Sequence, residues 1–190
     1  MNMDLELNRI ILVTNESAWL KSWIKVVPRN VFALNLWFFY FFGGGVLPGV
    51  GLGVLILNEN NQVLLILRND DPNKALSDMR LEGTWTLPAG KVKTGETLFE
   101  AAIRKTKQEV NLDISDLELI SIADDINEFA HFVTIGILAQ MYEGTIDLGD
   151  TEEHVDYGFF DFDNLPENLC LPSQKIINNY LNNTIYNEKN

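Results

Sequence analysis

Residues 90–112 read GKVKTGETLFEAAIRKTKQEVNL, a glycine-opened loop followed by an amphipathic segment. The segment from about Glu96 to Val110 predicts a helix, because its apolar residues recur at helical spacing. One arc of this helix is expected to pack on a sheet and holds Phe99, Ala102, Ile103, Thr106 and Val110. The opposite arc is expected to face a cleft or solvent and holds Glu100, Arg104, Lys105, Gln108 and Glu109.

The segments around this helix are mostly strand-like. Upstream, GLGVLIL and QVLLILRN are apolar runs separated by a polar turn at residues 58–62, a pattern that predicts a β-hairpin. A polar loop over residues 70–83 and a short strand ending at Pro88 follow. Downstream, three strand-like runs lie within residues 117–163, and an amphipathic helix begins at Leu171. The order β-β-β-α-β-β-β-α predicts an α+β or α/β domain with a mixed sheet.

The spacing of four residues in the opening stretch carries a family resemblance. Gly90, Glu96, Arg104 and Glu109 stand at G-x5-E-x7-R-x4-E. This resembles the Nudix box of the MutT-like hydrolases, whose pattern is G-x5-E-x7-R-E-U-x-E-E-x-G-U, where U is a bulky aliphatic residue. The resemblance runs from about residue 49 to residue 181.

The resemblance implies a fold and an activity. The fold would be α+β, an α/β/α sandwich in which a mixed sheet packs between helices, over residues 46–185. The activity would be metal-dependent hydrolysis of a phosphoanhydride in a nucleoside di- or triphosphate or a related nucleotide. The first 45 residues have no counterpart in the resemblance.

The metal-binding positions of the box are altered here. Three carboxylates on one side of a helix can hold Mg²⁺ or Mn²⁺, which would neutralise phosphate oxygens and activate a water. The resemblance places these carboxylates at Lys105, Gln108 and Glu109, and only Glu109 is acidic. The charge of the three positions is therefore zero instead of −3. Two hypotheses follow: an attenuated hydrolase, or a catalytically inactive domain that binds a nucleotide or a protein.

The resemblance also implies roles for individual residues. A minimal metal site would combine Glu109 with Gln108 and the backbone carbonyl of Ala89, which precedes Gly90. Glu152 and Glu153, with Asp150, lie in the acidic segment GDTEEHVDYG, where related enzymes supply a further base or ligand. The predicted catalytic set is Glu96, Arg104, Glu109, Glu152 and Glu153.

Other candidates concern scaffold and substrate. Glu96 at the helix start would accept backbone N–H bonds, and Arg104 would tie the loop to the helix. Gly90 and Gly95 suit turns with unusual backbone angles or close approach. Phosphate contacts are expected from Arg68 and Lys105, with a solvated arginine at the end of a strand as the alternative for Arg68. Base stacking is expected from Trp85 and Phe132, with core packing as the alternative for both aromatic residues. His131 and His154 are interpreted as structural or surface residues.

Charge and cysteine content limit the function classes. A net charge of −13 excludes a general nucleic-acid binder, because a polyanion would be repelled, whereas a small nucleotide remains compatible with local cations or a metal. The single cysteine, Cys170, can form no internal disulfide, which fits a cytoplasmic compartment. The sequence does not set the oligomeric state, and a homodimer stays open.

The N-terminal extension, residues 1–45, leaves several interpretations open. Its uncharged aromatic block at residues 31–42 follows two basic residues, as in an interfacial anchor on the cytoplasmic face of a membrane. A buried or partner-covered helix and a poorly ordered segment are the alternatives. Gly43–Gly45 and Pro48 interrupt the apolar run, so neither half reaches the ~18 residues of a spanning helix.

Overall fold

The computed structural model describes residues 47–75, 77–149 and 152–186. The predicted N-terminal extension and its aromatic block at residues 31–42 lie outside the described residues, as does Asp150.

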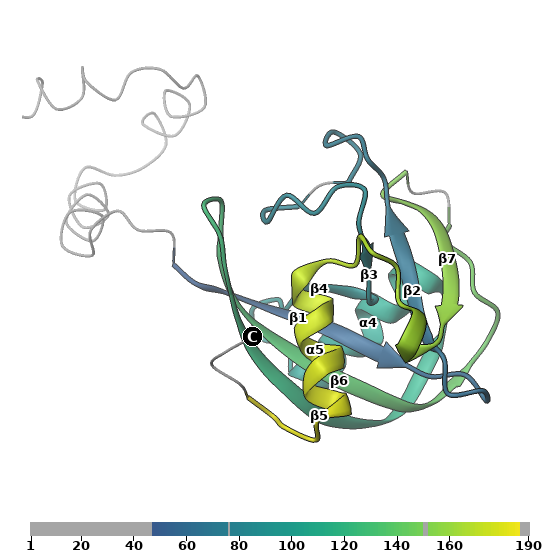
Figure 1. The fold of residues 1–190 in the computed structure, drawn as a ribbon. Helices are drawn as coiled ribbons and strands as arrows, with labels where there is room; N and C mark the ends of the chain where they lie inside the picture. Colours follow the sequence, from purple (N-terminus) through teal and green to yellow (C-terminus); the bar gives the residue numbers. More distant parts are fainter. Residues whose placement is uncertain (1–46, 76, 150–151, 187–190) are drawn as a thin grey trace, which may run out of the picture. The chain divides into compact units, whose positions relative to one another are not determined.

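The described part of the chain contains strands of two sheets and two α-helices (Figure 1). Before the first described helix lie β1 (Gly49–Ile56), β2 (Val63–Arg68), β3 (Trp85–Thr86) and β4 (Ala89–Lys91). Helix α4 (Leu98–Val110) is followed by β5 (Asp113–Ile126), β6 (His131–Glu143), β7 (His154–Phe160), a 3-10 turn (Phe162–Asn164) and α5 (Leu171–Leu181). The predicted order is therefore correct apart from β4, which occupies part of the expected loop.

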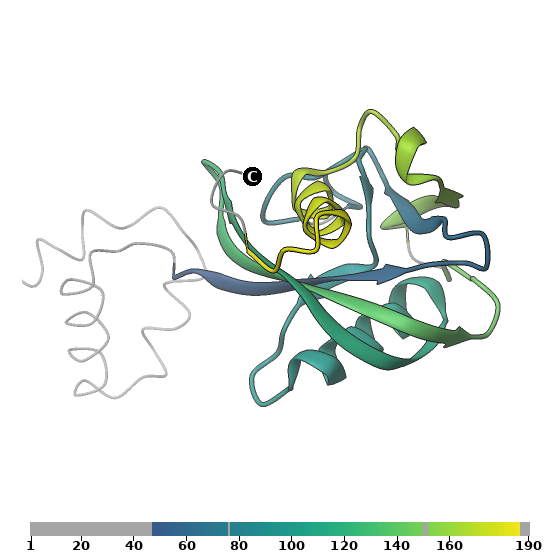
Figure 2. The ribbon, with the colours of Figure 1, turned by 60° about the horizontal axis from the view of Figure 1, so that its bottom comes forward.

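The strands form a mixed sheet and a smaller antiparallel one. The larger sheet has the order β4-β1-β6-β5, in which β1 runs parallel to β6 and antiparallel to β4. The smaller sheet has the order β3-β2-β7 and is antiparallel. Helices α4 and α5 lie on opposite faces of the larger sheet (Figure 2). The predicted α+β class, with a mixed sheet between helices, is confirmed.

The predicted hairpin of β1 and β2 is wrong beyond its turn. A single bridge between Leu57 and Val63 joins the two strands, and each then enters a different sheet. Both strands are apolar at nearly every position and largely buried. A strand buried on both faces suits the centre of a sheet, so each strand takes two other neighbours. Proximity in sequence did not select the partner.

Helix α4 starts at a capping box rather than at Glu96. Thr97 is the N-cap, its hydroxyl accepts from the backbone N–H of Glu100, and the Glu100 carboxylate accepts from the N–H of Thr97. These bonds satisfy N–H groups that no helical carbonyl can reach. Glu96 lies just before the cap.

The predicted packing arc of this helix needs correction. Phe99 and Ile103 are 44% and 43% exposed, whereas Glu109, assigned to the opposite arc, is 7% exposed. The residues of the helix that join the hydrophobic core are Ala101, Ala102 and Val110. Small alanines let the helix approach the sheet closely, and this orientation directs Glu109 toward β4.

Two hydrophobic clusters hold the layers together. One joins α4 to the larger sheet and includes Leu52, Ile137 and Val110. The other joins α5 to β1 and β2 and includes Leu55 and Ile176. Because β1 contributes to both clusters, it is the strand on which both helix layers depend.

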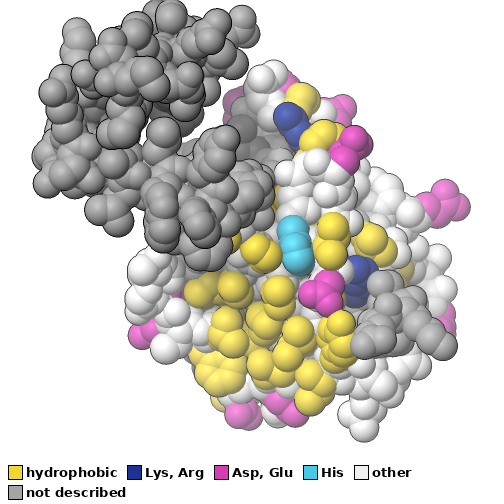
Figure 3. All heavy atoms as spheres, turned by 90° about the vertical axis from the view of Figure 1, so that its left-hand side faces the viewer, with side chains coloured by type: hydrophobic (Ala, Val, Ile, Leu, Met, Phe, Trp, Pro, Cys, Tyr) yellow, Lys and Arg dark blue, Asp and Glu magenta, His cyan; other side chains and the backbone are white. Residues whose placement is uncertain are grey.

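Hydrophobic side chains also gather on one outer face of the domain (Figure 3). Large apolar residues that are more than half exposed include Ile126 at the end of β5 and Met141 on β6. Among residues 47–75, 77–149 and 152–186, no helix has the length and apolar character needed to cross a bilayer.

Gly136 on β6 lies where β5 and α5 come closest to the strand. A Cβ at this position would lie 2.6 Å from the Cβ of Ser121 and 2.8 Å from Ile176. Gly136→Ala is therefore expected to reduce the free energy of unfolding by about 1–3 kcal/mol, the usual effect of overpacking. Gly51→Ala is the matched control, since a Cβ on Gly51 would meet nothing closer than 3.6 Å. Urea denaturation of both variants tests this, and equal stability would contradict it.

Candidate active site

A cavity of about 340 Å³ opens between β1, β4, β6 and the N-terminal end of α5. Ser77, Asp78, Met79 and Leu81, from the polar loop over residues 70–83, form part of its wall. The cavity brings together seven of the predicted site residues: Arg68, Ala89, Gly90, Lys105, Glu109, Phe132 and Glu153.

The loop before α4 is held by the side chain of Arg104. Its Nε donates to Glu96 Oε1 at 2.6 Å, and its Nη2 donates to Glu96 Oε2 at 2.8 Å and to the Lys91 carbonyl at 3.0 Å. Glu96 also accepts the Lys93 N–H. The Arg104 guanidinium lowers the pKa of Glu96 to about 2. The predicted tie between loop and helix is thus present, and both side chains hold the scaffold rather than line the cavity.

The Glu109 carboxylate, from the last turn of α4, forms part of the cavity wall. Its Oε2 accepts the Ala89 N–H at 2.8 Å, and its Oε1 pairs with the Lys105 ammonium at 2.6 Å. Burial raises the pKa of the Glu109 carboxyl, against the opposing influence of Lys105 and the Ala89 amide. The contact between Ala89 and Glu109 therefore involves the amide, whereas the sequence-based hypothesis concerned the Ala89 carbonyl.

Gly90 makes room for the Lys105 side chain. A Cβ on Gly90 would lie 2.1 Å from Lys105 Cε, so no other residue fits there without displacing the lysine. The lysine stem therefore crosses the glycine and carries its ammonium to Glu109. An internal cation thus occupies a position where the family pattern places a carboxylate.

Gln108, the other altered position of the box, points elsewhere. It is exposed, its Oε1 accepts from Arg104 Nη1 at 3.2 Å, and it is absent from the cavity wall. The geometry does not bring Gln108 to Glu109 as a second ligand. The three-carboxylate arrangement implied by the family pattern does not fit α4 in this chain.

A second carboxylate, Glu153, reaches the cavity from the turn just before β7. The Glu153 carbonyl accepts the Asn69 N–H at 2.8 Å, and Glu153 Oε1 pairs with Arg68 Nη2 at 3.1 Å. These contacts arise because His154 at the start of β7 lies opposite Arg68 at the end of β2, where the pairing has a register shift. Strand pairing thus places Glu153 near Glu109 although 44 positions separate them in the sequence.

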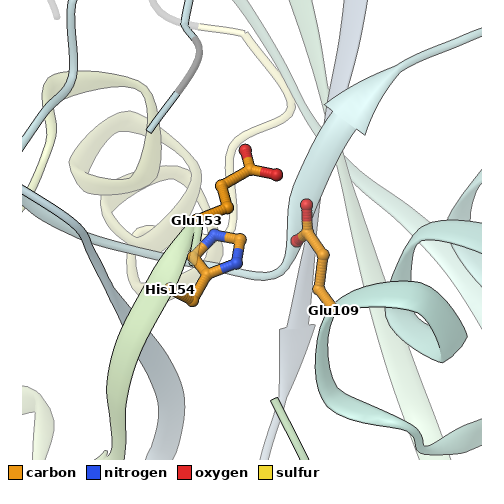
Figure 4. A group of neighbouring side chains, drawn as sticks. All are labelled: Glu109, Glu153 and His154. Carbon is orange, nitrogen blue, oxygen red and sulfur yellow. The ribbon is translucent and has the colours of Figure 1, made fainter. Parts of the chain in front are cut away.

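His154 completes a group that the sequence did not reveal. Ligand atoms of Glu109, Glu153 and His154 all lie within 4.8 Å of one another, and Figure 4 shows the three side chains converging. His154 is 5% exposed, and its Nε2 has no hydrogen-bond partner among the described residues. Burial lowers the pKa of His154 to about 4, so the imidazole is neutral at pH 7. In the sequence, only the position of His154 directly after Glu153 pointed to its place in this group.

Two further predicted residues, Glu152 and Trp85, also lie away from this group. Glu152 is exposed and pairs with Lys74 at 2.9 Å. Trp85 packs edge-on against Phe160, with ring centroids 4.9 Å apart, and joins the hydrophobic cluster beneath α5. Neither residue belongs to the cavity wall.

Part of the cavity wall is aromatic and cationic. Phe132 lies against Gly49, where a Cβ would be 2.4 Å from the ring, and Gly51 and Gly53 continue the same face of β1 into the cavity. The Lys91 ammonium lies 5.7 Å from the Phe132 ring centroid. Alternating glycines at residues 49, 51 and 53 were the sequence signal for this hollow face, because a strand places such residues on one side.

Fold and site together define a Nudix-type domain. The NUDIX domain family model matches residues 47–180, and the chain belongs to this family.

Relatives agree with this assignment. An ADP-ribose pyrophosphatase from Methanocaldococcus jannaschii is 31% identical over 128 residues, which are 66% of this chain and 69% of the relative. An NAD-capped RNA hydrolase NudC from Pseudomonas aeruginosa is 28% identical over 134 residues, 70% of this chain but only 46% of the relative. A crystal structure of a MutT NUDIX hydrolase from Burkholderia pseudomallei superimposes with a TM-score of 0.62 at 26% identity, covering 70% of this chain and 98% of that chain.

The clamp between Glu96 and Arg104 predicts a pH-dependent stability. The folded-state pKa of Glu96 is about 2, below its ordinary value of 4.5, so the stabilisation is full above pH 4.5 and is lost toward pH 2. Glu96→Gln is expected to lower the melting temperature at pH 7. The difference in melting temperature between this variant and the wild type should become smaller below pH 4.5. Glu59→Gln, at an exposed turn, is the control. A difference in melting temperature that does not change with pH would contradict stabilisation by the pair of Glu96 and Arg104.

Proposed function

We propose that this domain is a nucleotide phosphoanhydride hydrolase whose activity is attenuated by its altered box. The observation that carries the proposal is a single cavity lined by the carboxylates of Asp78, Glu109 and Glu153, each paired with one of the cations Lys91, Lys105 and Arg68. A pyrophosphate needs such cations for binding, and its hydrolysis needs a carboxylate near the attacking water.

The cavity wall suggests how a substrate would lie. Phe132 offers a half-buried aromatic face for a base, and Lys91 at its edge can reach the phosphate next to it. Arg68 and Lys105, also in the cavity wall, can meet the second phosphate. The scissile bond would then lie near Glu109 and Glu153. A nucleoside diphosphate linked to another group matches this order of contacts.

The hydrolysis itself breaks one P–O bond. A water oxygen bonds to phosphorus, the bridging oxygen leaves with the other phosphate, and the water proton passes to a base. Glu153 is suited to that role because its side chain is 35% exposed, whereas Glu109 is buried and bonded to Ala89 and Lys105. The products would be a nucleoside monophosphate and the second phosphate ester.

A divalent ion, Mg²⁺ or Mn²⁺, would neutralise phosphate oxygens and lower the pKa of the attacking water. Glu109 and Glu153 are the carboxylates placed to hold it. Lys105 and Arg68 already neutralise these two groups, so the charge available to a hard cation is small. This balance is the physical reason for expecting attenuated activity.

The pair formed by Lys105 and Glu109 favours a second candidate function. The Lys105 ammonium, 2.6 Å from Glu109 Oε1, could bind a phosphate without any metal. The domain would then be a catalytically inactive nucleotide-binding module. Nucleotide-induced thermal stabilisation in the presence of EDTA, without turnover, would support this alternative.

A hydrolysis panel separates the two candidates. ADP-ribose is the first substrate to test, because an ADP-ribose pyrophosphatase is among the relatives, followed by NADH, a nucleotide sugar and the nucleoside triphosphates. Wild-type protein at high concentration is expected to release nucleoside monophosphate from at least one of them with Mg²⁺ or Mn²⁺. Absence of turnover across the panel, with folded protein, would overturn the hydrolase proposal.

Restoring the box provides a second test. Lys105→Glu places a carboxylate beside Glu109 and is expected to raise the Mg²⁺-dependent rate by roughly 30- to 1000-fold, the usual value of such electrostatic stabilisation. Lys107→Glu is the matched control, since it makes the same charge change on the exposed face of α4. Equal rates for the wild type and Lys105→Glu would show that Lys105 does not limit the reaction.

A further inference from the structure

We infer that Asp78, in the polar loop between β2 and β3, determines which nucleotides the cavity binds, because it holds Lys91 and repels ligands with many phosphate charges. The inference rests on the proposed function only in taking the cavity as a nucleotide site. It concerns binding, so it can be tested without turnover and without a metal ion.

Asp78 and Lys91 form an ion pair in the cavity wall. Asp78 Oδ2 lies 2.5 Å from Lys91 Nζ, and the two side chains are 56% and 61% exposed. Exposed ion pairs contribute little to stability, because water solvates both charges well when they are apart. A phosphate that enters the cavity can therefore take the place of the Asp78 carboxylate on the ammonium. Lys91 is then available to the ligand only when Asp78 gives it up.

Contacts of the neighbouring residues keep Asp78 near this place. The Met79 carbonyl accepts from Asn127 Nδ2 at 2.9 Å, and the Arg80 guanidinium lies 5.8 Å from the Phe129 ring centroid. Both partners belong to the turn between β5 and β6, so the loop is attached to a separate element by contacts outside the ion pair. The carboxylate therefore stays close when a phosphate displaces it, and its charge acts on that phosphate.

The cavity offers no excess of positive charge to a polyanion. Among the described residues of its wall, three cations and three carboxylates are paired one to one: Lys91 with Asp78, Lys105 with Glu109, and Arg68 with Glu153. Like charges about 7 Å apart still repel each other in water, so each further phosphate on a ligand adds to the repulsion by Asp78. The cavity should thus favour a nucleoside diphosphate joined to an uncharged group over a nucleoside triphosphate.

Binding of ADP-ribose and of ATP to the full chain, measured by titration calorimetry in EDTA at low salt, tests this role. The two ligands share adenosine and differ in phosphate charge. Asp78→Asn is expected to raise the affinity for ADP-ribose about threefold and the affinity for ATP on the order of tenfold, because the ligand with more phosphates loses more repulsion. Both gains should become smaller at about 1 M salt, where charges are screened beyond roughly 3 Å.

Two further variants separate this effect from a general change in charge or structure. Asp70→Asn is the matched control, because Asp70 is an exposed residue of the same loop that lies outside the cavity wall. It removes the same charge and should leave the ratio of the two affinities unchanged. Lys91→Gln should weaken the binding of both ligands. Substitutions of the two partners of one ion pair then have opposite effects, which loss of structure would not produce.

The outcomes for the inference and for the proposed function are distinct. An affinity for ATP that does not rise in Asp78→Asn, or an equal rise for both ligands, would overturn the role of Asp78. The expected shift in affinities without any nucleotide hydrolysis would overturn only the hydrolase proposal. Absence of binding by both ligands to the wild type and to Asp78→Asn would overturn both.

Discussion

The Glu109 carboxylate is the point at which helix, loop and cavity meet. It is 7% exposed, and a buried anion is tolerated only when hydrogen bonds and a countercharge surround it. The Ala89 amide supplies the first and the Lys105 ammonium the second. These two contacts bind the C-terminal half of α4 to β4 and bring Lys105 across Gly90. The form of the candidate site follows from satisfying this one charge.

The rest of the box keeps the loop in place independently of any metal. Arg104 bonds both oxygens of Glu96 and the Lys91 carbonyl, and the capping box at Thr97 starts the helix. None of these contacts involves Lys105 or Gln108. A scaffold of this kind can therefore persist while the chemistry at Lys105 and Gln108 changes, which is why family membership and activity are separate questions here.

The two altered positions of the box are not equivalent in space. Lys105 enters the cavity and neutralises Glu109, whereas Gln108 is exposed and bonds to Arg104. His154, at the start of β7, lies beside Glu153 and near Glu109.

Much of the fold followed from local pattern. The periodicity of residues 96–110 specified a helix, the apolar runs specified strands, and the spacing of Gly90, Glu96, Arg104 and Glu109 specified the family. These features depend on contacts between residues close in the chain or on a short motif. The pairing of β1 with β6 instead of β2 did not follow, because any strand apolar on both faces has several acceptable neighbours.

The candidate site divides in the same way. The motif alone located Glu109, Arg104 and Lys105 on one helix, and the loss of acidic residues was visible in the letters. The approach of Glu153 and His154 to Glu109 was not, because it arises from the pairing of β7 with β2 across 85 positions of chain. Nor was the burial of His154, since exposure depends on which surfaces the layers cover. Helical spacing is a local property of sequence, whereas the meeting of two strands is a property of the packed chain.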